Sequence, residues 1–364
     1  MPSYFRCTFS LLSTCSLTVS SLLIHPAIAA DAQVQGAVTA TYLTASDSDV
    51  DAETLGVFDM DIDGELGQGR WHIYLEGTSS SNADRVTDVY GEAYADAGAA
   101  TDENGDGRIQ VSNFEVYYPL GNGELVAGLL YPSGFTESGD WSNDETSQFI
   151  SSSFVNIQTS AAPDYALGVG YQGAISSQLS FSALLSQAQG LGDIDSTYSA
   201  LLDQEDEYFV SAELVWQVSQ FALHTAVWAT TLESETFDAS DEEKNHGLNI
   251  SLAHQNALGQ VVLRYGIANE AVSEAKQFSA ISVQKDIQDF SLGLGLSQTE
   301  VSHDYQKVSA ADDIQQHEFY TRYQATDVLS LTLSLQKIQN SGFGLSPEYD
   351  ENPTIFSFRT SAEF

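Results

Sequence analysis

The chain has 364 residues, and its 51 Asp and Glu against 12 Lys and Arg give a formal net charge of −39 at pH 7. This charge disfavours nucleic acid as a partner, because a protein that binds backbone phosphates needs clustered basic residues. It fits either a solvated acidic surface or a negative field that attracts cations. Beyond the N-terminus, no apolar run approaches the ~18 residues of a membrane-spanning helix.

The first thirty residues have the pattern of a secretory signal peptide. Arg6 gives a weak positive start, an apolar stretch diluted with Ser follows, and an A-x-A motif precedes residue 31. We therefore expect 31–364 to be the exported domain. Both cysteines, Cys7 and Cys15, lie in the leader, so this domain has no disulfide and no cysteine nucleophile. A lipoprotein acylated at Cys15 is the alternative.

Stretches of alternating apolar and polar residues recur through the rest of the chain, each near the ~9–11 residues that a tilted strand needs to cross a bilayer. The predicted strands are 33–43, 54–65, 69–77, 108–120, 123–131, 165–172, 178–187, 206–216, 219–231, 246–255, 258–268, 277–285, 289–299, 316–324, 328–337 and 354–364. No stretch shows helical periodicity over three turns.

The connections between these strands alternate in length. Short turns stand at 67–69, 121–123, 217–219, 257–259, 286–288 and 325–327. Long acidic loops stand at 46–53, 78–107, 132–164, 190–205, 233–245, 269–277, 300–315 and 338–352. Outer-membrane barrels place short turns in the periplasm and long loops outside the cell. The sequence thus predicts an all-β fold, a transmembrane antiparallel β-barrel of sixteen strands in the bacterial outer membrane.

One long loop contains a calcium-like motif. Asp102, Asn104 and Asp106 occupy the first, third and fifth positions of an EF-hand-like loop, with Gly107 at the sixth-position turn. Asn113 stands at the twelfth position, where a bidentate Glu would complete the site. Structural Ca²⁺ and a plain acidic turn both remain open, and no other cofactor is expected.

The third long loop, 132–164, is the natural constriction element, because a loop of this length is usually functional or disordered. Its acidic first half contains Asp140, Trp141, Asp144 and Glu145, which we expect in the channel. Its second half is apolar enough to pack against the barrel wall.

The same loop carries a family resemblance. Residues 147–156 (SQFISSSFVN) and 162–169 (APDYALGV) resemble the S-Q-F-L-x-S-x-F-V-N … P-x-Y-x-L-G-V pattern of the carbohydrate-selective porins of the OprB type. The resemblance covers about 25 residues well, and architecture alone matches the rest of the chain. It implies a sixteen-stranded monomeric channel that passes sugars, with aromatic and charged residues at the constriction.

Strand parity predicts which side chains face the lumen, because Arg or Lys on the lipid face costs about 2–4 kcal/mol at the membrane centre. Charged residues facing inward would either create a transverse field that orients polar solutes or neutralise buried carboxylates. The predicted lumen wall comprises Arg70, His72, Glu76, Asn113, Glu115, Arg264, Glu318, Arg322 and Arg359.

The last strand ends in Phe364, with Phe356 and Phe358 on the same face. This resembles the C-terminal strand that the outer-membrane insertion machinery recognises, so we expect that machinery and outer-membrane lipid as partners. Other aromatic residues cluster near strand ends, as in interfacial girdles.

No enzymatic constellation stands out: the sequence has no HExxH, no G-x-S-x-G elbow and no P-loop. We therefore expect a channel and not an enzyme. The leading hypothesis is a porin for passive diffusion of small polar solutes, with carbohydrates as the expected substrates, and the expected assembly is a monomer or a homotrimer. A general cation-preferring porin is the alternative, and an acidic adhesin or structural barrel is the alternative from another class.

Overall fold

The computed structural model describes residues 32–79, 85–97, 100, 107–137, 144–191, 198–202, 207–237, 239–309, 311–341 and 349–364. Within these residues the strands form one closed sheet. No helix of this described part is long and apolar enough to span a membrane.

Each of the sixteen predicted strands is confirmed, with ends that shift by a few residues. The strands are β1 (Gln33–Ala45), β2 (Glu53–Leu66), β3 (Gly69–Thr78), β4 (Ile109–Leu120), β5 (Gly123–Leu130), β6 (Ala166–Ala174), β7 (Leu179–Gln187), β8 (Tyr208–Val218), β9 (Phe221–Glu235), β10 (Glu242–Asn256), β11 (Gly259–Ala268), β12 (Ala275–Ile287), β13 (Phe290–Val301), β14 (Ile314–Gln324), β15 (Leu329–Gln339) and β16 (Thr354–Glu363). Short helices lie in the connections: α1 (Val86–Val89), η1 (Gly91–Ala93), η2 (Pro132–Phe135), α2 (Ser152–Val155), α3 (Tyr198–Leu202) and α4 (His303–Val308).

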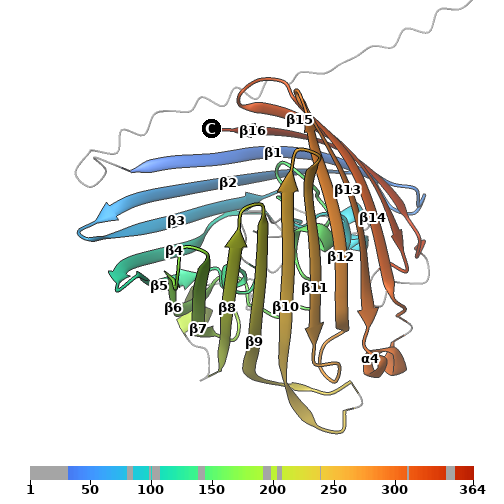
Figure 1. Ribbon diagram of the computed structural model, residues 1–364. Helices are drawn as coiled ribbons and strands as arrows, with labels where there is room; N and C mark the ends of the chain where they lie inside the picture. Colours follow the sequence, from blue (N-terminus) through green and yellow to red (C-terminus); the bar gives the residue numbers. More distant parts are fainter. Residues whose placement is uncertain are drawn as a thin grey trace, which may run out of the picture. The chain divides into compact units, whose positions relative to one another are not determined.

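The barrel closes where the first and last strands meet. Every strand pairs with its sequence neighbours, and β16 pairs with β1 in antiparallel register (Figure 1). At the seam, the backbone N–H of Gly36 donates to Phe364 O at 3.0 Å, and the N–H of Phe364 donates to Gly36 O at 2.9 Å. Closure leaves no strand edge unpaired, as a sheet in lipid requires.

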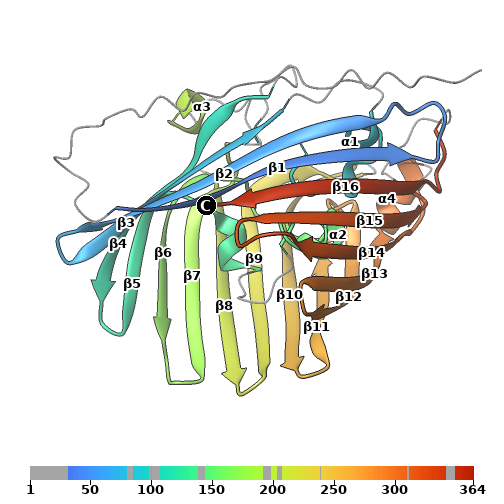
Figure 2. The ribbon, with the colours of Figure 1, turned by 90° about the horizontal axis from the view of Figure 1, so that it is seen from above.

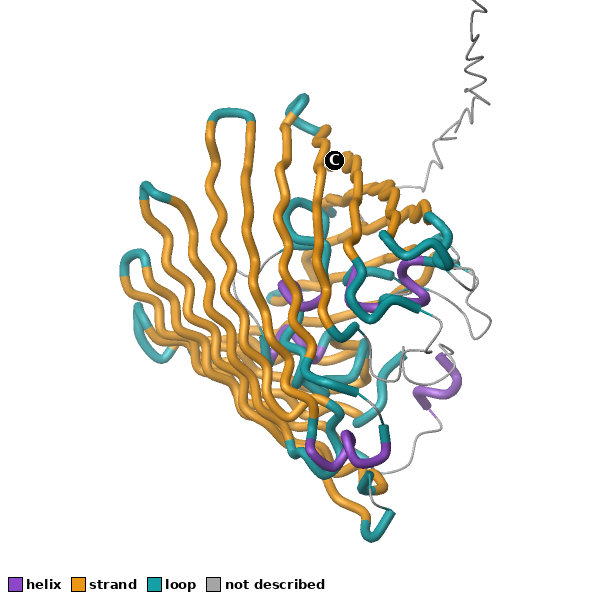
Figure 3. The backbone as a smooth tube through the Cα atoms, turned by 90° about the vertical axis from the view of Figure 1, so that its right-hand side faces the viewer, coloured by secondary structure: helices purple, strands orange, loops and turns teal. Residues whose placement is uncertain are grey.

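The two ends of the barrel differ as the alternation of loop lengths predicts. Tight turns join the even strands to the odd strands that follow, and Gly67 and Gly121 adopt positive φ in two of them. The longer connections, which contain the short helices, gather at the other end of the strands (Figure 3). This asymmetry is characteristic of outer-membrane barrels.

The strands are apolar outside and polar or small inside. Val38, Val227 and Leu294 are about half exposed on the outer face (48%, 53% and 51%). Trp216 and Phe221, on either side of one tight turn, are also exposed, at 50% and 49%. An outer surface of this kind suits lipid and an interfacial aromatic girdle.

The C-terminal seam carries a testable expectation. Phe364 is 58% exposed, and its backbone forms the last rung between β16 and β1. Deleting Phe364 should reduce severalfold the amount of heat-modifiable, folded barrel in outer-membrane fractions, because both the final rung and the terminal aromatic ring are lost. Phe364→Leu keeps the rung and is the matched control. Normal levels of the deletion variant would contradict the assembly role.

Apolar packing lies inside the barrel and beneath its longer connections. We call residues 79–108, between β3 and β4, loop 2, and residues 131–165, between β5 and β6, loop 3. The largest apolar cluster joins loop 2 and loop 3 to β1, β2, β14, β15 and β16: Leu43, Val50, Leu55, Val57, Val86, Tyr90, Ala93, Tyr94, Ile150, Ile314, Ile338 and Ile355. Figure 2 shows α2 of loop 3 enclosed by the strands. Both loops therefore narrow the interior.

Candidate functional site: the lumen and its inward loop

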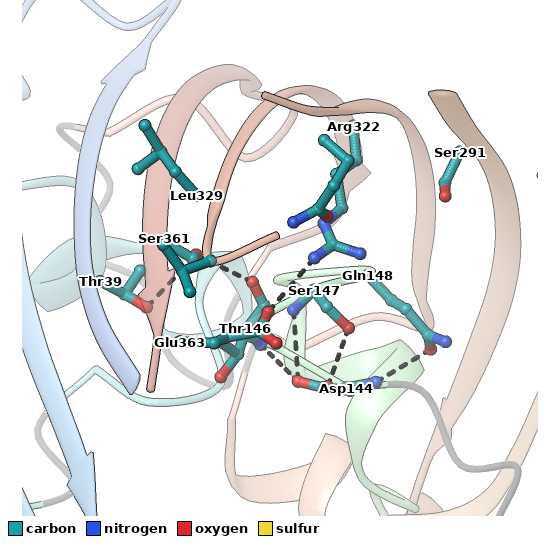
Figure 4. Close-up of polar contacts among 12 residues, drawn as sticks. Thr39, Asp144, Thr146, Ser147, Gln148, Ser291, Arg322, Leu329, Ser361 and Glu363 are labelled. Atoms are coloured by element: carbon teal, nitrogen blue, oxygen red, sulfur yellow. Dashed lines mark hydrogen bonds and ion pairs between the residues drawn. The ribbon is translucent and has the colours of Figure 1, made fainter. Parts of the chain in front are cut away.

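Loop 3 is attached to the barrel wall through inward-facing side chains, beginning at β16. Arg359 donates to the carbonyl oxygens of Glu145 and Gln148, the latter at 2.8 Å. Ser361 Oγ donates to Thr146 O at 3.0 Å, and Figure 4 shows this segment beside the strand. Arg359 is only 1% exposed. Its guanidinium therefore binds the loop backbone instead of facing a solute.

A second anchor is Glu318 on β14. Its carboxylate accepts backbone N–H bonds from Ile150 at 3.2 Å and Ser151 at 3.1 Å, and a bond from Ser334 Oγ at 2.7 Å. Hydrogen bonds to an ionised acceptor are about twice as strong as those between neutral groups. Glu318 thus holds the loop just before α2.

A third anchor lies on β11. Arg264 Nη1 donates to Val155 O at 2.5 Å. Nearby, the loop residue Glu137 accepts a hydrogen bond from the backbone N–H of Ile157 at 2.7 Å. Burial raises the pKa of the Glu137 carboxyl, and the Ile157 bond and the Arg264 charge oppose this rise. Loop 3 therefore follows the wall from β11 to β16.

Aromatic packing reinforces these polar anchors. The ring centroid of Phe149 lies 5.0 Å from that of Phe154 and 4.8 Å from that of Tyr320 on β14. Gly295 on β13 faces this cluster, and a Cβ there would lie 2.6 Å from Phe154 Cε1. The inward glycine thus makes room for the loop, a signal in the sequence that our prediction did not use.

Loop 2 is fixed beside loop 3. Glu53 at the start of β2 accepts hydrogen bonds from the backbone N–H of Thr87 at 3.0 Å and from its Oγ1 at 2.8 Å. The two loops also bond to each other, because the N–H of Ala95 donates to Ile150 O at 2.8 Å. The two loops therefore pack together inside the barrel.

The other two predicted lumen arginines lie near the turn end and are paired with carboxylates. Arg70 Nη2 is 3.1 Å from Glu124 Oε2, and its guanidinium lies 3.4 Å from the ring centroid of Tyr117. Arg322 Nη2 is 3.2 Å from Glu363 Oε1. The positive charges predicted for the wall are therefore each matched, two by loop carbonyls and two by carboxylates.

Glu76 and Glu115 lie inside the barrel, and neighbouring side chains satisfy their carboxylates. Glu76 is 4% exposed and accepts hydrogen bonds from Ser112 Oγ at 2.5 Å and Tyr165 Oη at 2.9 Å. Glu115 is 5% exposed and accepts one from Asn113 Nδ2 at 3.1 Å. Both carboxylates therefore accept hydrogen bonds from neighbouring side chains and present little charge to the lumen.

A row of aspartates on β2 presents more accessible negative charge. Asp59, Asp61 and Asp63 share the inward face of the strand and are half-buried. Predicted lumen residue His72 lies between two of them, with Nε2 3.4 Å from Asp61 Oδ1 and Nδ1 3.1 Å from Asp63 Oδ1. Asp59 accepts a hydrogen bond from Tyr74 Oη at 2.5 Å.

Our sequence-based prediction missed this aspartate row, although the sequence carries the signal. The three aspartates alternate with Phe58, Met60 and Ile62 within one predicted strand. Because successive side chains of a strand point to opposite faces, that alternation alone places all three carboxylates in the lumen.

The two described residues of the predicted constriction differ in role. Asp144 caps its own turn: Oδ1 accepts from the N–H of Thr146 at 2.7 Å, and Oδ2 accepts from Ser147 Oγ at 2.8 Å (Figure 4). For Glu145, burial first and then the charge of Asp144 raise the pKa of the carboxyl to about 7. Glu145 is therefore a loop carboxyl that titrates near neutrality.

Some predicted residues fall outside the described part. These are the signal peptide, Asp140 and Trp141 of the constriction, and the calcium-motif residues Asp102, Asn104 and Asp106. Within the part of the chain that the structure describes, no group of three or more His, Cys, Asp or Glu could hold a metal ion. The calcium motif and the two constriction residues stay predictions.

Comparison with solved structures identifies the same fold in porins. OprB of Pseudomonas putida matches with a TM-score of 0.71 at 11% identity, over 92% of this chain and 94% of that chain. A triple mutant of the Rhodopseudomonas blastica porin matches with a TM-score of 0.52 at 14% identity, over 92% of this chain and all of that chain. No protein-family model and no curated protein sequence matches. The expected likeness to OprB is thus confirmed, and this chain has the sixteen-stranded barrel fold of bacterial porins.

Proposed function

We propose that the protein is an outer-membrane porin through which small polar solutes diffuse, with a preference for cations. The aspartate row on β2 carries this proposal. Asp59, Asp61 and Asp63 are half-buried inward charges, whereas Arg264 and Arg359 are held under loop 3. A solute in the lumen thus meets more uncompensated negative charge than positive charge.

The placement of loop 3 strengthens this effect. Its anchors follow β11 to β16, and the inner faces of β2 and β3 carry half-buried residues such as Asp61 and His72. Acidic groups beside low-dielectric walls focus the field and raise the local concentration of counter-ions. Passage between loop 3 and this wall would therefore favour cations.

Reversal potentials in planar bilayers under a salt gradient test the proposal. We expect Asp61→Asn with Asp63→Asn to lower the cation-to-anion permeability ratio. After screening, a carboxylate several ångströms from the ion contributes about 1 kcal/mol, or about fivefold. Glu242→Gln with Glu243→Gln, on the exposed start of β10, removes the same charge outside the lumen and should change the ratio little.

Three outcomes count against parts of the proposal. An unchanged ratio in the Asp61, Asp63 variant would show that another segment selects ions. An equal effect of the β10 control would assign selection to the charge of the extracellular rim. Absence of any conductance would favour the structural or adhesive barrel.

Carbohydrate passage is the second candidate. Residues 147–169 resemble carbohydrate-selective porins, and the fold matches OprB. Current block by added neutral oligosaccharides, measured in the same bilayers, tests it. A sugar-selective channel should be blocked at concentrations that leave a general porin open.

A further inference from the structure

We propose that Tyr74, Tyr131 and Tyr165 form a binding site for small organic cations that carry an ammonium or guanidinium group. The proposal rests on the proposed porin function and adds the class of solute. The three tyrosines converge where loop 3 leaves and rejoins the wall, since Tyr131 follows β5 and Tyr165 precedes β6.

The rings form a ladder that water can reach. The ring centroid of Tyr165 lies 5.4 Å from that of Tyr131 and 6.3 Å from that of Tyr74 on β3. Tyr131 is 40% exposed, and the other two residues are half-buried. A tyrosine that served only to pack the loop would bury its ring, so the exposed surface of Tyr131 is available to a solute.

The backbone of Tyr165, whose ring lies between the other two, has an unfavourable conformation. Tyr165 has a φ of 52°, in the left-handed region, which is unfavourable for a residue with a Cβ. Tyr165 and Leu167 both pack against the buried cluster of Leu129, Leu191 and Leu201. In this conformation the Oη of Tyr165 donates a hydrogen bond to Glu76 Oε2 at 2.9 Å. Strain of this kind concentrates at functional sites.

Negative charge surrounds the ladder. The hydroxyls of Tyr74 and Tyr165 are bound by the carboxylates of Asp59 and Glu76. Enclosure within the barrel, followed by the charges of Glu137, Asp164 and Glu145, raises the pKa of Tyr131, the third ring. The ladder therefore combines electron-rich ring faces with several carboxylates.

This combination favours organic cations over the other solute classes. A cation over a tyrosine ring is attracted by the ring quadrupole, and its N–H groups can donate to nearby carboxylates. A neutral sugar can stack on a ring but gains nothing from the charge. A small hydrated inorganic ion responds to the charge but presents no surface to stack on the rings.

Block of single-channel current by agmatine, which carries both an ammonium and a guanidinium group, tests the site. Agmatine should block the wild-type channel at lower concentration than glucose does. Tyr131→Leu should raise the half-blocking concentration of agmatine by about fivefold or more, the equivalent of about 1 kcal/mol. Tyr131→Phe keeps the ring, so agmatine should block this variant at the same concentration as the wild type. Heat-modifiability and conductance in KCl confirm that each variant folds and opens.

The outcomes separate this proposal from the function on which it rests. The KCl reversal potential reports the cation preference, and Tyr131→Leu should leave it nearly unchanged because no charge is removed. Equal block by glucose and agmatine, or an unchanged half-blocking concentration in Tyr131→Leu, would overturn the organic-cation site even if the channel prefers cations. A reversal potential without cation preference would instead overturn the proposed selectivity.

Discussion

Arg359→Met should release the tip of loop 3 and produce larger, noisier single-channel currents than the wild type. The guanidinium donates to two loop carbonyls and is almost fully buried. Hydrogen bonds from a charged donor are worth about 1.5–3 kcal/mol each, and Met supplies no donor. We therefore expect the free energy of unfolding, measured by urea titration in detergent, to fall by about 3–6 kcal/mol. Planar-bilayer recording and urea titration measure the two effects.

Arg70→Met is the matched control, because it removes an equal charge from the lumen wall. Arg70 pairs with Glu124 near the turn end, away from the loop anchor on β16. It should shift ion selectivity without adding current noise. If Arg359→Met leaves both conductance and urea stability unchanged, then Glu318 and the aromatic cluster hold the loop without Arg359.

Cation preference should increase as the pH rises from about 6 to about 8, around the Glu145 pKa of about 7. Burial disfavours the charged form of this carboxyl, so it is mostly neutral at the lower pH and mostly ionised at the higher one. Ionisation adds one negative charge to the inward loop and attracts cations more strongly. Reversal potentials across a series of pH values, at low salt where screening is weak, measure the change.

Glu145→Gln should flatten that part of the pH dependence, because glutamine does not titrate. Glu242→Gln, on the exposed rim, should preserve it. A full pH dependence in Glu145→Gln would assign the titration to another lumen group.

Local patterns were sufficient to predict the strands and their connections. The alternation in segments such as 328–337, together with turn residues such as Gly67 and Gly121, specifies strand and turn with little help from the rest of the chain. A period of two also assigns each residue to one face, so the inward positions of Arg70, Glu115 and their neighbours followed from parity. The same rule also places the aspartates of β2 on the inward face, although our prediction did not include them.

The roles of those inward residues depended on which parts of the chain meet inside the barrel. Arg359 contacts Glu145 and Gln148, which lie more than two hundred positions earlier in the sequence, and Glu318 contacts Ile150, which lies 168 positions earlier. Strand parity shows that a charge points inward, but it does not show whether that charge contacts a loop backbone or remains accessible to a solute. The two-residue alternation of the strands and the residue types of the turns are local properties, so the sequence alone predicts them. The partners of a buried charge are set by how loop 3 crosses the closed barrel, because only that packing decides which charges water and solutes can still reach.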